Sequence, residues 1–117
     1  MSAQISIYHN PRCSKSRQTL ALIQEQGIEP EVILYLQAPL DAKQLNSILK
    51  KLGISARELL RKGEQAYKTL NLANKDLSNS ELVDAMISEP KLIERPIVIK
   101  GDQAVLGRPP ENVNKLL

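Results

Sequence analysis

The 117-residue chain is predicted to fold as an α/β domain, because strand-like segments near both ends flank a long stretch with helical periodicity. The first third reads as strand, helix, strand, and the last part as strand, strand, helix. We therefore expect a four-stranded mixed sheet with a mostly helical insert, over about residues 40–90, between the second and third strands. No repeat or long linker interrupts this pattern, so a single domain over residues 1–117 is expected.

The opening segment predicts two strands joined by a helix. Residues 5–9 (ISIYH) alternate apolar with smaller or polar side chains, which is typical of a strand. Residues 14–26 repeat apolar positions at helical spacing, and Gly27 follows as a C-cap residue. Residues 31–36 (EVILYL) are apolar enough for a strand inside a sheet. A strand–helix–strand order normally gives a parallel pair with a right-handed crossover.

Three capping boxes mark helix starts in the middle of the chain. They are Asp41 with Gln44, Ser55 with Glu58, and Ser78 with Glu81. Gly53 is placed to end the first of these helices, and Pro90 to end the last.

The final segment predicts a hairpin and a short helix. Residues 96–99 (PIVI) read as the third strand, residues 101–103 as a turn, and residues 104–107 (AVLG) as a strand that pairs back. The two prolines at 109–110 open a short C-terminal helix.

Composition excludes several classes of function. The net charge is +3 with the cations scattered among acids, and the only aromatic residues are three tyrosines, so no nucleic-acid surface is expected. A small anionic substrate fits this charge better. No apolar run reaches the roughly 18 residues of a membrane span, and no secretory signal is visible. One cysteine cannot form an internal disulfide, which favours a reducing cytoplasm.

The single cysteine, Cys13, is expected at the junction of the first strand and the first helix. Unpaired N–H groups and the helix dipole favour an anion there, and Arg12, Lys15 and Arg17 add positive charge. We therefore predict a reactive thiol with a pKa below the roughly 8.5 of free cysteine. The alternative is a buried structural cysteine. It is less favoured, because the flanking residues are mostly polar or charged.

Ser16 stands where the second cysteine of a C-x-x-C motif would be. A dithiol cycle within the site is therefore unavailable, and any redox cycle must take its second thiol from glutathione or a redoxin. His9 could tune the thiol or fix the loop by a hydrogen bond, and a purely structural loop histidine is an equally favoured alternative. One Cys and one His do not make a zinc cluster, so no metal is expected.

For the Arg95–Pro96 bond, sequence alone favours trans, since about one X-Pro bond in twenty is cis.

Four motifs together resemble the glutaredoxin-like arsenate reductase family of the thioredoxin-fold superfamily, along the whole chain. They are IYHNPRCSKSR with an H-N-P-x-C-x-x-S core, LLRKGEQAY, ERPIV and LGRPPE. Characterised members typically carry Gly-Thr in place of Ser14 and Lys15 and extend further beyond the third arginine. The chain is therefore expected in the short, arsenate reductase-like branch.

The resemblance implies a thioredoxin-like fold and a cis bond before Pro96. It implies Cys13 as the catalytic residue and arginines that bind the oxyanion. These arginines are Arg61, Arg95 and Arg108, and the supporting residues are His9, Asn10, Ser16 and Pro96. It further implies reduction of arsenate to arsenite through a Cys13 adduct and a mixed disulfide with glutathione. Glutathione would be the co-substrate and glutaredoxin the partner, with no bound cofactor.

Physical chemistry agrees with this assignment of the arginines. The planar guanidinium donates two parallel hydrogen bonds and so suits a tetrahedral oxyanion. Arg95 and Arg108 each precede a proline, which restricts the backbone there. Arg17 and Arg57 are expected instead as surface charges or weak ion pairs.

Two other functions stay open. The same superfamily branch includes Spx-type transcription regulators that bind RNA polymerase, for which the helical insert would be an interaction surface. Many of those regulators have a C-x-x-C switch, which this chain lacks, and they need not retain all three arginines. The other alternative is a monothiol reductase with a different physiological substrate.

Overall fold

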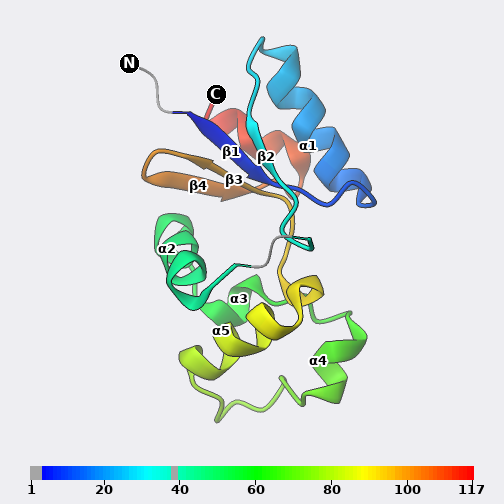
Figure 1. Cartoon of the computed structure of the whole chain (residues 1–117), viewed down its shortest axis with the longest axis vertical. Coiled ribbons are helices and arrows are strands. Elements are labelled where there is room, and N and C mark those ends of the chain that lie inside the picture. Colours follow the sequence, from blue (N-terminus) through cyan, green and yellow to red (C-terminus); the bar gives the residue numbers. More distant parts are fainter. Residues whose placement is uncertain (1–3, 38–39) are drawn as a thin grey trace. The chain divides into compact units, whose positions relative to one another are not determined.

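The computed structural model describes residues 4–37 and 40–117. These residues form two compact units (Figure 1). The sheet unit comprises residues 4–37 and 95–117, and the helical unit comprises residues 40–94. The helical unit coincides closely with the expected insert. The expectation of one domain over the whole chain stays a prediction.

The sheet unit contains four short strands in the order β2-β1-β3-β4. Their bounds are Ile5–Tyr8 for β1, Glu31–Ile33 for β2, Ile97–Lys100 for β3 and Gln103–Leu106 for β4. β1 pairs in parallel with β2 and antiparallel with β3, and β4 pairs antiparallel with β3. The sheet is therefore mixed, as the sequence predicts.

Two helical segments complete the sheet unit: α1, Ser14–Glu25, and the 3₁₀ segment η2, Pro110–Lys115. They pack against each other (Figure 1). The core between them and the sheet is aliphatic and contains Ile5, Ile7, Ile23, Val98, Val113 and Leu116. The apolar alternation in β1 and the helical spacing in α1 thus bury one face of each element.

The second strand differs from the prediction. β2 ends at Ile33, and a turn follows in which the Gln37 N–H donates to the Leu34 carbonyl at 2.9 Å. β2 is also an edge strand, with Val32 43% exposed, rather than an interior one. The apolar residues after Ile33 predicted a longer strand, but Tyr35 lies in a turn and its side chain is buried there. An apolar run does not by itself distinguish a strand from a buried turn.

The helical unit is built from short helices. Their bounds are Ala42–Leu52 for α2, Ala56–Leu59 for α3, Gln65–Thr69 for α4, Asn79–Ser88 for α5 and Pro90–Leu92 for the 3₁₀ segment η1. All three predicted capping boxes are present, at the starts of α2, α3 and α5. Gly53 ends α2 with φ +70°, a left-handed conformation that favours glycine. Within the described part of the chain, no helix is long and apolar enough to cross a bilayer.

Candidate active site around Cys13

The loop between β1 and α1 places Cys13 at the N-cap of α1. Its backbone N–H donates to the Asn10 carbonyl at 3.0 Å, and its carbonyl accepts from the Arg17 N–H at 3.0 Å. The Cys13 side chain is partly buried. The first-turn N–H groups of α1 and the positive end of its dipole therefore act on the sulfur.

The environment of Cys13 lowers the pKa of its thiol. Burial alone would raise this pKa, because it disfavours the thiolate. Hydrogen bonds from the Ser16 backbone and the Arg95 side chain, the positive charge of Arg95, and a hydrogen bond from the Lys15 backbone together outweigh burial. The net direction and the contribution of the helix N-terminus match the prediction from sequence, but the arginine that acts on the thiol is the distant Arg95 rather than Arg12 or Arg17.

Arg108 approaches the same sulfur from the segment after β4. Its Nη1 lies 4.0 Å from Cys13 Sγ and donates to the Arg95 carbonyl at 3.2 Å. The 4.0 Å contact is long even for a hydrogen bond to sulfur, so Arg95 is the stronger influence on the thiol pKa. The Arg108 carbonyl in turn accepts from Asn112 Nδ2 at 3.1 Å. Two of the three predicted arginines thus lie beside Cys13.

Both of these arginines precede cis prolines. The cis bond between Arg95 and Pro96 agrees with the resemblance and not with the trans expectation from sequence alone. The cis bond between Arg108 and Pro109 was not predicted.

Ser16 is the hydrogen-bonding centre of the loop. Its side chain is fully buried, and its Oγ lies 2.6 Å from His9 Nδ1. The same Oγ accepts from the Asn10 N–H at 3.0 Å. Asn10 Oδ1 then accepts from the Arg12 N–H at 3.0 Å. Three of the four supporting residues expected from sequence, His9, Asn10 and Ser16, are therefore connected, and His9 holds the loop through Ser16.

His9 is buried and its pKa is lowered. Burial is the main cause, because it disfavours the imidazolium, and the positive charge of Arg17 adds to it. A neutral imidazole at neutral pH fits a hydrogen-bonding role in the loop.

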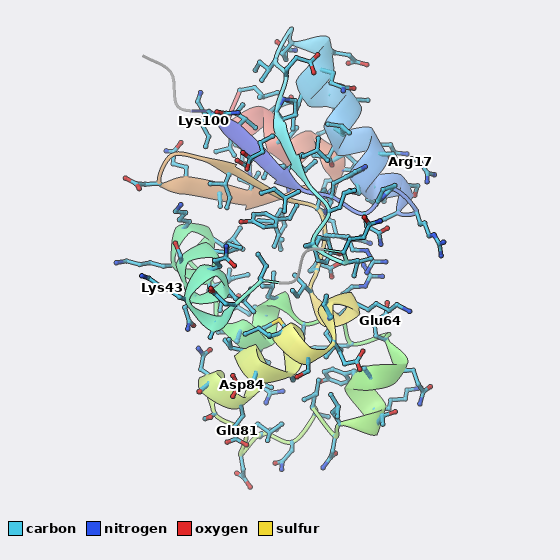
Figure 2. All side chains as sticks on the ribbon, in the orientation of Figure 1. Arg17, Lys43, Glu64, Glu81, Asp84 and Lys100 are labelled. Atoms are coloured by element: carbon cyan, nitrogen blue, oxygen red, sulfur yellow. The ribbon has the colours of Figure 1, made fainter. Side chains whose placement is uncertain are left out.

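Two arginines that were expected as surface charges have structural hydrogen bonds. Arg17, labelled near the start of α1 in Figure 2, is exposed but donates from Nη1 to the Pro11 carbonyl at 2.8 Å. Arg57 is half-buried and donates to the carbonyls of Leu72 and Asn74, both at 2.8 Å. The prediction for Arg57 was wrong, because a guanidinium can satisfy loop carbonyls that have no helical partner.

Arg61, the third predicted arginine, belongs to the helical unit. Its Nη1 lies 2.9 Å from Glu94 Oε1, and its Nε lies 3.5 Å from Glu64 Oε1. The sequence argument did not identify these carboxylates, although both stand inside the quoted motifs. The other predicted site residues belong to the sheet unit.

A close approach behind the loop was also missed. The Gly107 N–H donates to the Pro96 carbonyl at 2.9 Å, and Thr19 Oγ1 donates to the carbonyls of Lys15 at 2.8 Å and Gly107 at 3.3 Å. A Cβ on Gly107 would lie 2.5 Å from Thr19 Oγ1 and 2.7 Å from Pro96 Cγ. Only glycine fits between α1 and Pro96, immediately before Arg108.

Among residues 4–37 and 40–117, no group of three or more His, Cys, Asp or Glu side chains is arranged to hold a metal ion. What the sheet-unit site can do chemically follows from its groups. It presents one thiol with a lowered pKa, two guanidinium groups and a helix N-terminus, a combination suited to nucleophilic attack on a bound anion.

The chain is similar to known proteins along nearly its whole length. The model of the ArsC family matches residues 8–116. The chain is 56% identical over 118 residues to the uncharacterized protein YfgD of Escherichia coli, covering all of this chain and 99% of that protein. It is 54% identical over 114 residues to an arsenate reductase of Haemophilus influenzae, covering 97% of this chain and 98% of that protein.

Solved structures give the same result. The arsenate reductase from Vibrio cholerae has a TM-score of 0.96 at 47% identity, and each chain covers all of the other. A putative arsenate reductase from Yersinia pestis has a TM-score of 0.92 at 52% identity, covering 96% of this chain and 99% of that one. The fold is therefore thioredoxin-like, as the resemblance implied. On the family match and these relatives, the chain belongs to the ArsC family.

Proposed function

We propose that this protein is an arsenate reductase that uses glutathione and glutaredoxin. The observation that carries the proposal is the Cys13 sulfur at the N-terminus of α1, with a lowered pKa and with Arg95 and Arg108 beside it. The names of the Haemophilus and Vibrio relatives support arsenate as the substrate. The lone cysteine supports an external thiol as the reductant.

In the first step, the Cys13 thiolate attacks the arsenic atom of bound arsenate. A sulfur–arsenic bond forms, and an arsenate oxygen leaves as hydroxide or, once protonated, as water. Arg95 and Arg108 would stabilise the negative charge on the arsenate oxygens during this displacement. We include Arg61 as a third ligand of the anion, on the grounds of its motif and its order along the chain.

In the second step, the glutathione thiolate attacks the Cys13 sulfur. The sulfur–arsenic bond breaks, and a disulfide forms between Cys13 and glutathione. Arsenic retains the electron pair and is reduced from As(V) to As(III), released as arsenite. Glutaredoxin then reduces the mixed disulfide and restores the Cys13 thiol. This cycle requires a compartment rich in reduced glutathione, such as the cytoplasm.

The test is arsenate-dependent oxidation of glutathione in the presence of glutaredoxin. Wild type should turn over, and Cys13→Ser should be inactive while remaining folded. Equal rates for the two proteins would eliminate the mechanism. Capture of RNA polymerase by both proteins, without arsenate turnover by either, would instead favour the transcription-regulator alternative.

A further inference from the structure

Asn112, a residue of η2, bridges two carbonyl groups on either side of Gly107. Its Nδ2 donates to the Leu106 carbonyl at 3.2 Å and to the Arg108 carbonyl at 3.1 Å. A side-chain amide nitrogen carries two protons, so both bonds form at once. The amide oxygen could not take the place of the nitrogen, because it would face two other oxygens. Asn112 thus ties the last residue of β4 and, two positions later, Arg108 to η2.

Thr19 binds the same segment less strongly. Its hydroxyl oxygen lies 2.8 Å from the Lys15 carbonyl and 3.3 Å from the Gly107 carbonyl. A hydroxyl has one proton to share between these two acceptors, and the shorter contact with Lys15 is the stronger. Thr19 therefore holds the residue before Arg108 only weakly, whereas the bond from Asn112 reaches the Arg108 backbone directly.

The Arg108 side chain extends from this tethered backbone to the thiol. Its Nη1 donates to the Arg95 carbonyl at 3.2 Å and lies 4.0 Å from Cys13 Sγ. Arg108 is thus held at both ends, by Asn112 at its carbonyl and by Arg95 at its guanidinium. All four residues belong to the sheet unit. A long side chain that is already restrained loses less conformational entropy when it binds an anion.

We propose that Asn112 is a positioning residue, which directs the Arg108 guanidinium toward an anion bound at Cys13. This inference rests on the proposed function, in which Arg108 binds the oxyanion. A guanidinium binds a tetrahedral anion through two parallel hydrogen bonds, and such a pair is sensitive to small displacements. Without the Asn112 bonds, the backbone at Arg108 can shift, and the guanidinium leaves the geometry that the anion requires.

Protection of the Cys13 thiol against iodoacetamide by inorganic phosphate measures anion binding without any turnover. The alkylation rate is followed near neutral pH, without glutathione, while phosphate is added. Asn112→Leu keeps the approximate size of the side chain and removes both donors. Asn112→Gln keeps the amide and is the conservative variant. Asn114→Leu is the matched control, because Asn114 is an exposed asparagine two residues later on η2.

In Asn112→Leu we expect the phosphate concentration for half-protection to rise about three- to tenfold relative to Asn114→Leu. Asn112→Gln should recover part of this loss, because its amide still carries the donors. Asn112→Ala should shift the concentration in the same direction, and it serves if Asn112→Leu does not fold. In an Arg108→Ala background, the further change caused by Asn112→Leu should be less than about twofold, because the guanidinium to be positioned is absent. Equal effects of Asn112→Leu in the two backgrounds would overturn the inference.

The titration of the Cys13 thiol distinguishes positioning of Arg108 from a general structural role. Burial raises the pKa of this thiol, and the first-turn N–H groups of α1 together with the Arg95 side chain outweigh burial. None of these groups is bound by Asn112, so alkylation followed against pH should give the wild-type midpoint in Asn112→Leu. A midpoint raised as far as in Arg95→Met would show that Asn112 maintains the whole site, and the inference would be overturned.

Arg108→Ala separates the inference from the proposed function. If this variant leaves phosphate protection unchanged, the part of the proposed function that assigns Arg108 to the anion is wrong, and the role of Asn112 falls with it. If Arg108→Ala weakens protection while Asn112→Leu and Asn112→Ala match Asn114→Leu, the role of Asn112 is overturned and the proposed function stands.

Discussion

Nη1 of Arg108 lies 4.0 Å from the sulfur of Cys13, and the carbonyl of Arg95 accepts from the same nitrogen at 3.2 Å. The backbone of one arginine thus orients the side chain of another toward the thiol. The guanidinium carries five N–H donors in a planar fork. Lysine carries its charge at a single nitrogen and cannot present the same planar fork.

Replacing Arg108 by lysine should therefore impair catalysis even though the charge is kept. We expect kcat/KM for arsenate to fall about 10- to 100-fold, the usual effect of losing a hydrogen bond to a charged group. The measurement is the arsenate-dependent oxidation of glutathione. Arg12→Lys is the control, because Arg12 is an exposed arginine of the same loop. Equal losses in the two variants would contradict a special role for Arg108.

Replacing Arg95 by methionine should raise the pKa of Cys13. The Arg95 side chain supplies both a hydrogen bond and a positive charge that favour the thiolate. Alkylation of Cys13 followed against pH should give a midpoint below that of free cysteine in wild type and a higher midpoint in Arg95→Met. A wild-type midpoint at or above that of free cysteine would refute the electrostatic account of the site.

Ser16→Ala should destabilise the protein by about 1–3 kcal/mol, since it leaves His9 Nδ1 and the Asn10 N–H buried without their Ser16 partner. Urea unfolding measures this change. Ser14→Ala is the matched control, because Ser14 is an exposed serine two residues earlier. A loss for Ser14→Ala as large as that for Ser16→Ala would show that the buried hydrogen bonds do not decide the stability of the loop.

His9 should titrate below the usual range of histidine, because burial and the positive charge of Arg17 both oppose its protonation. It is the only histidine of the chain, so a single imidazole signal in NMR reports its pKa directly. Arg17→Gln should raise that pKa. An unchanged signal in Arg17→Gln would leave burial as the sole cause.

The same shift makes stability depend on pH. The pKa of His9 is lower in the folded state than in the unfolded chain, so the unfolded state binds more protons as the pH falls. The contribution of neutral His9 to the free energy of unfolding is fully present above the unfolded pKa of about 6.5. It is lost as the pH falls through the folded pKa. His9→Gln should reduce the pH dependence of the free energy of unfolding over that window. Urea unfolding at a series of pH values checks the sign.

Gly107→Ala should destabilise the protein by about 1–3 kcal/mol, because the added methyl group overlaps Thr19 and the ring of Pro96. It should also lower arsenate turnover, since the displaced residue adjoins Arg108. Gly63→Ala is the control, as an added Cβ there meets no atom within 4 Å. A Gly107→Ala protein as stable and active as the control would show that the segment moves aside without cost.

Local chemistry accounts for much of what the sequence predicted correctly. The capping boxes at Asp41, Ser55 and Ser78 are satisfied within four residues, so no distant contact can overrule them easily. The position of Cys13 at a helix N-terminus likewise follows from the strand before it and the helical periodicity after it. The prediction of an interior strand over residues 31–36 was wrong, because the position of this segment depends on long-range contacts. β3 pairs with β1 on the side opposite β2, which leaves β2 at the edge of the sheet, and the Tyr35 side chain is buried although Tyr35 lies in a turn.

By itself, the sequence determined the α/β order, the three capped helix starts and the position of the single thiol at a helix N-terminus, all of which depend on residues near one another in the chain. Tertiary structure alone decided which groups reach that thiol and which restrain them. Arg95 and Arg108 are more than eighty residues from Cys13, and Gly107 is more than eighty residues from Thr19. Only the pairing of β1 with β3 brings these residues together. Periodicity and capping report local backbone preferences and carry no information on such distances. The partners of His9, Arg57 and Arg61 became visible only with the folded chain, because burial and hydrogen bonding are properties of assembled surfaces.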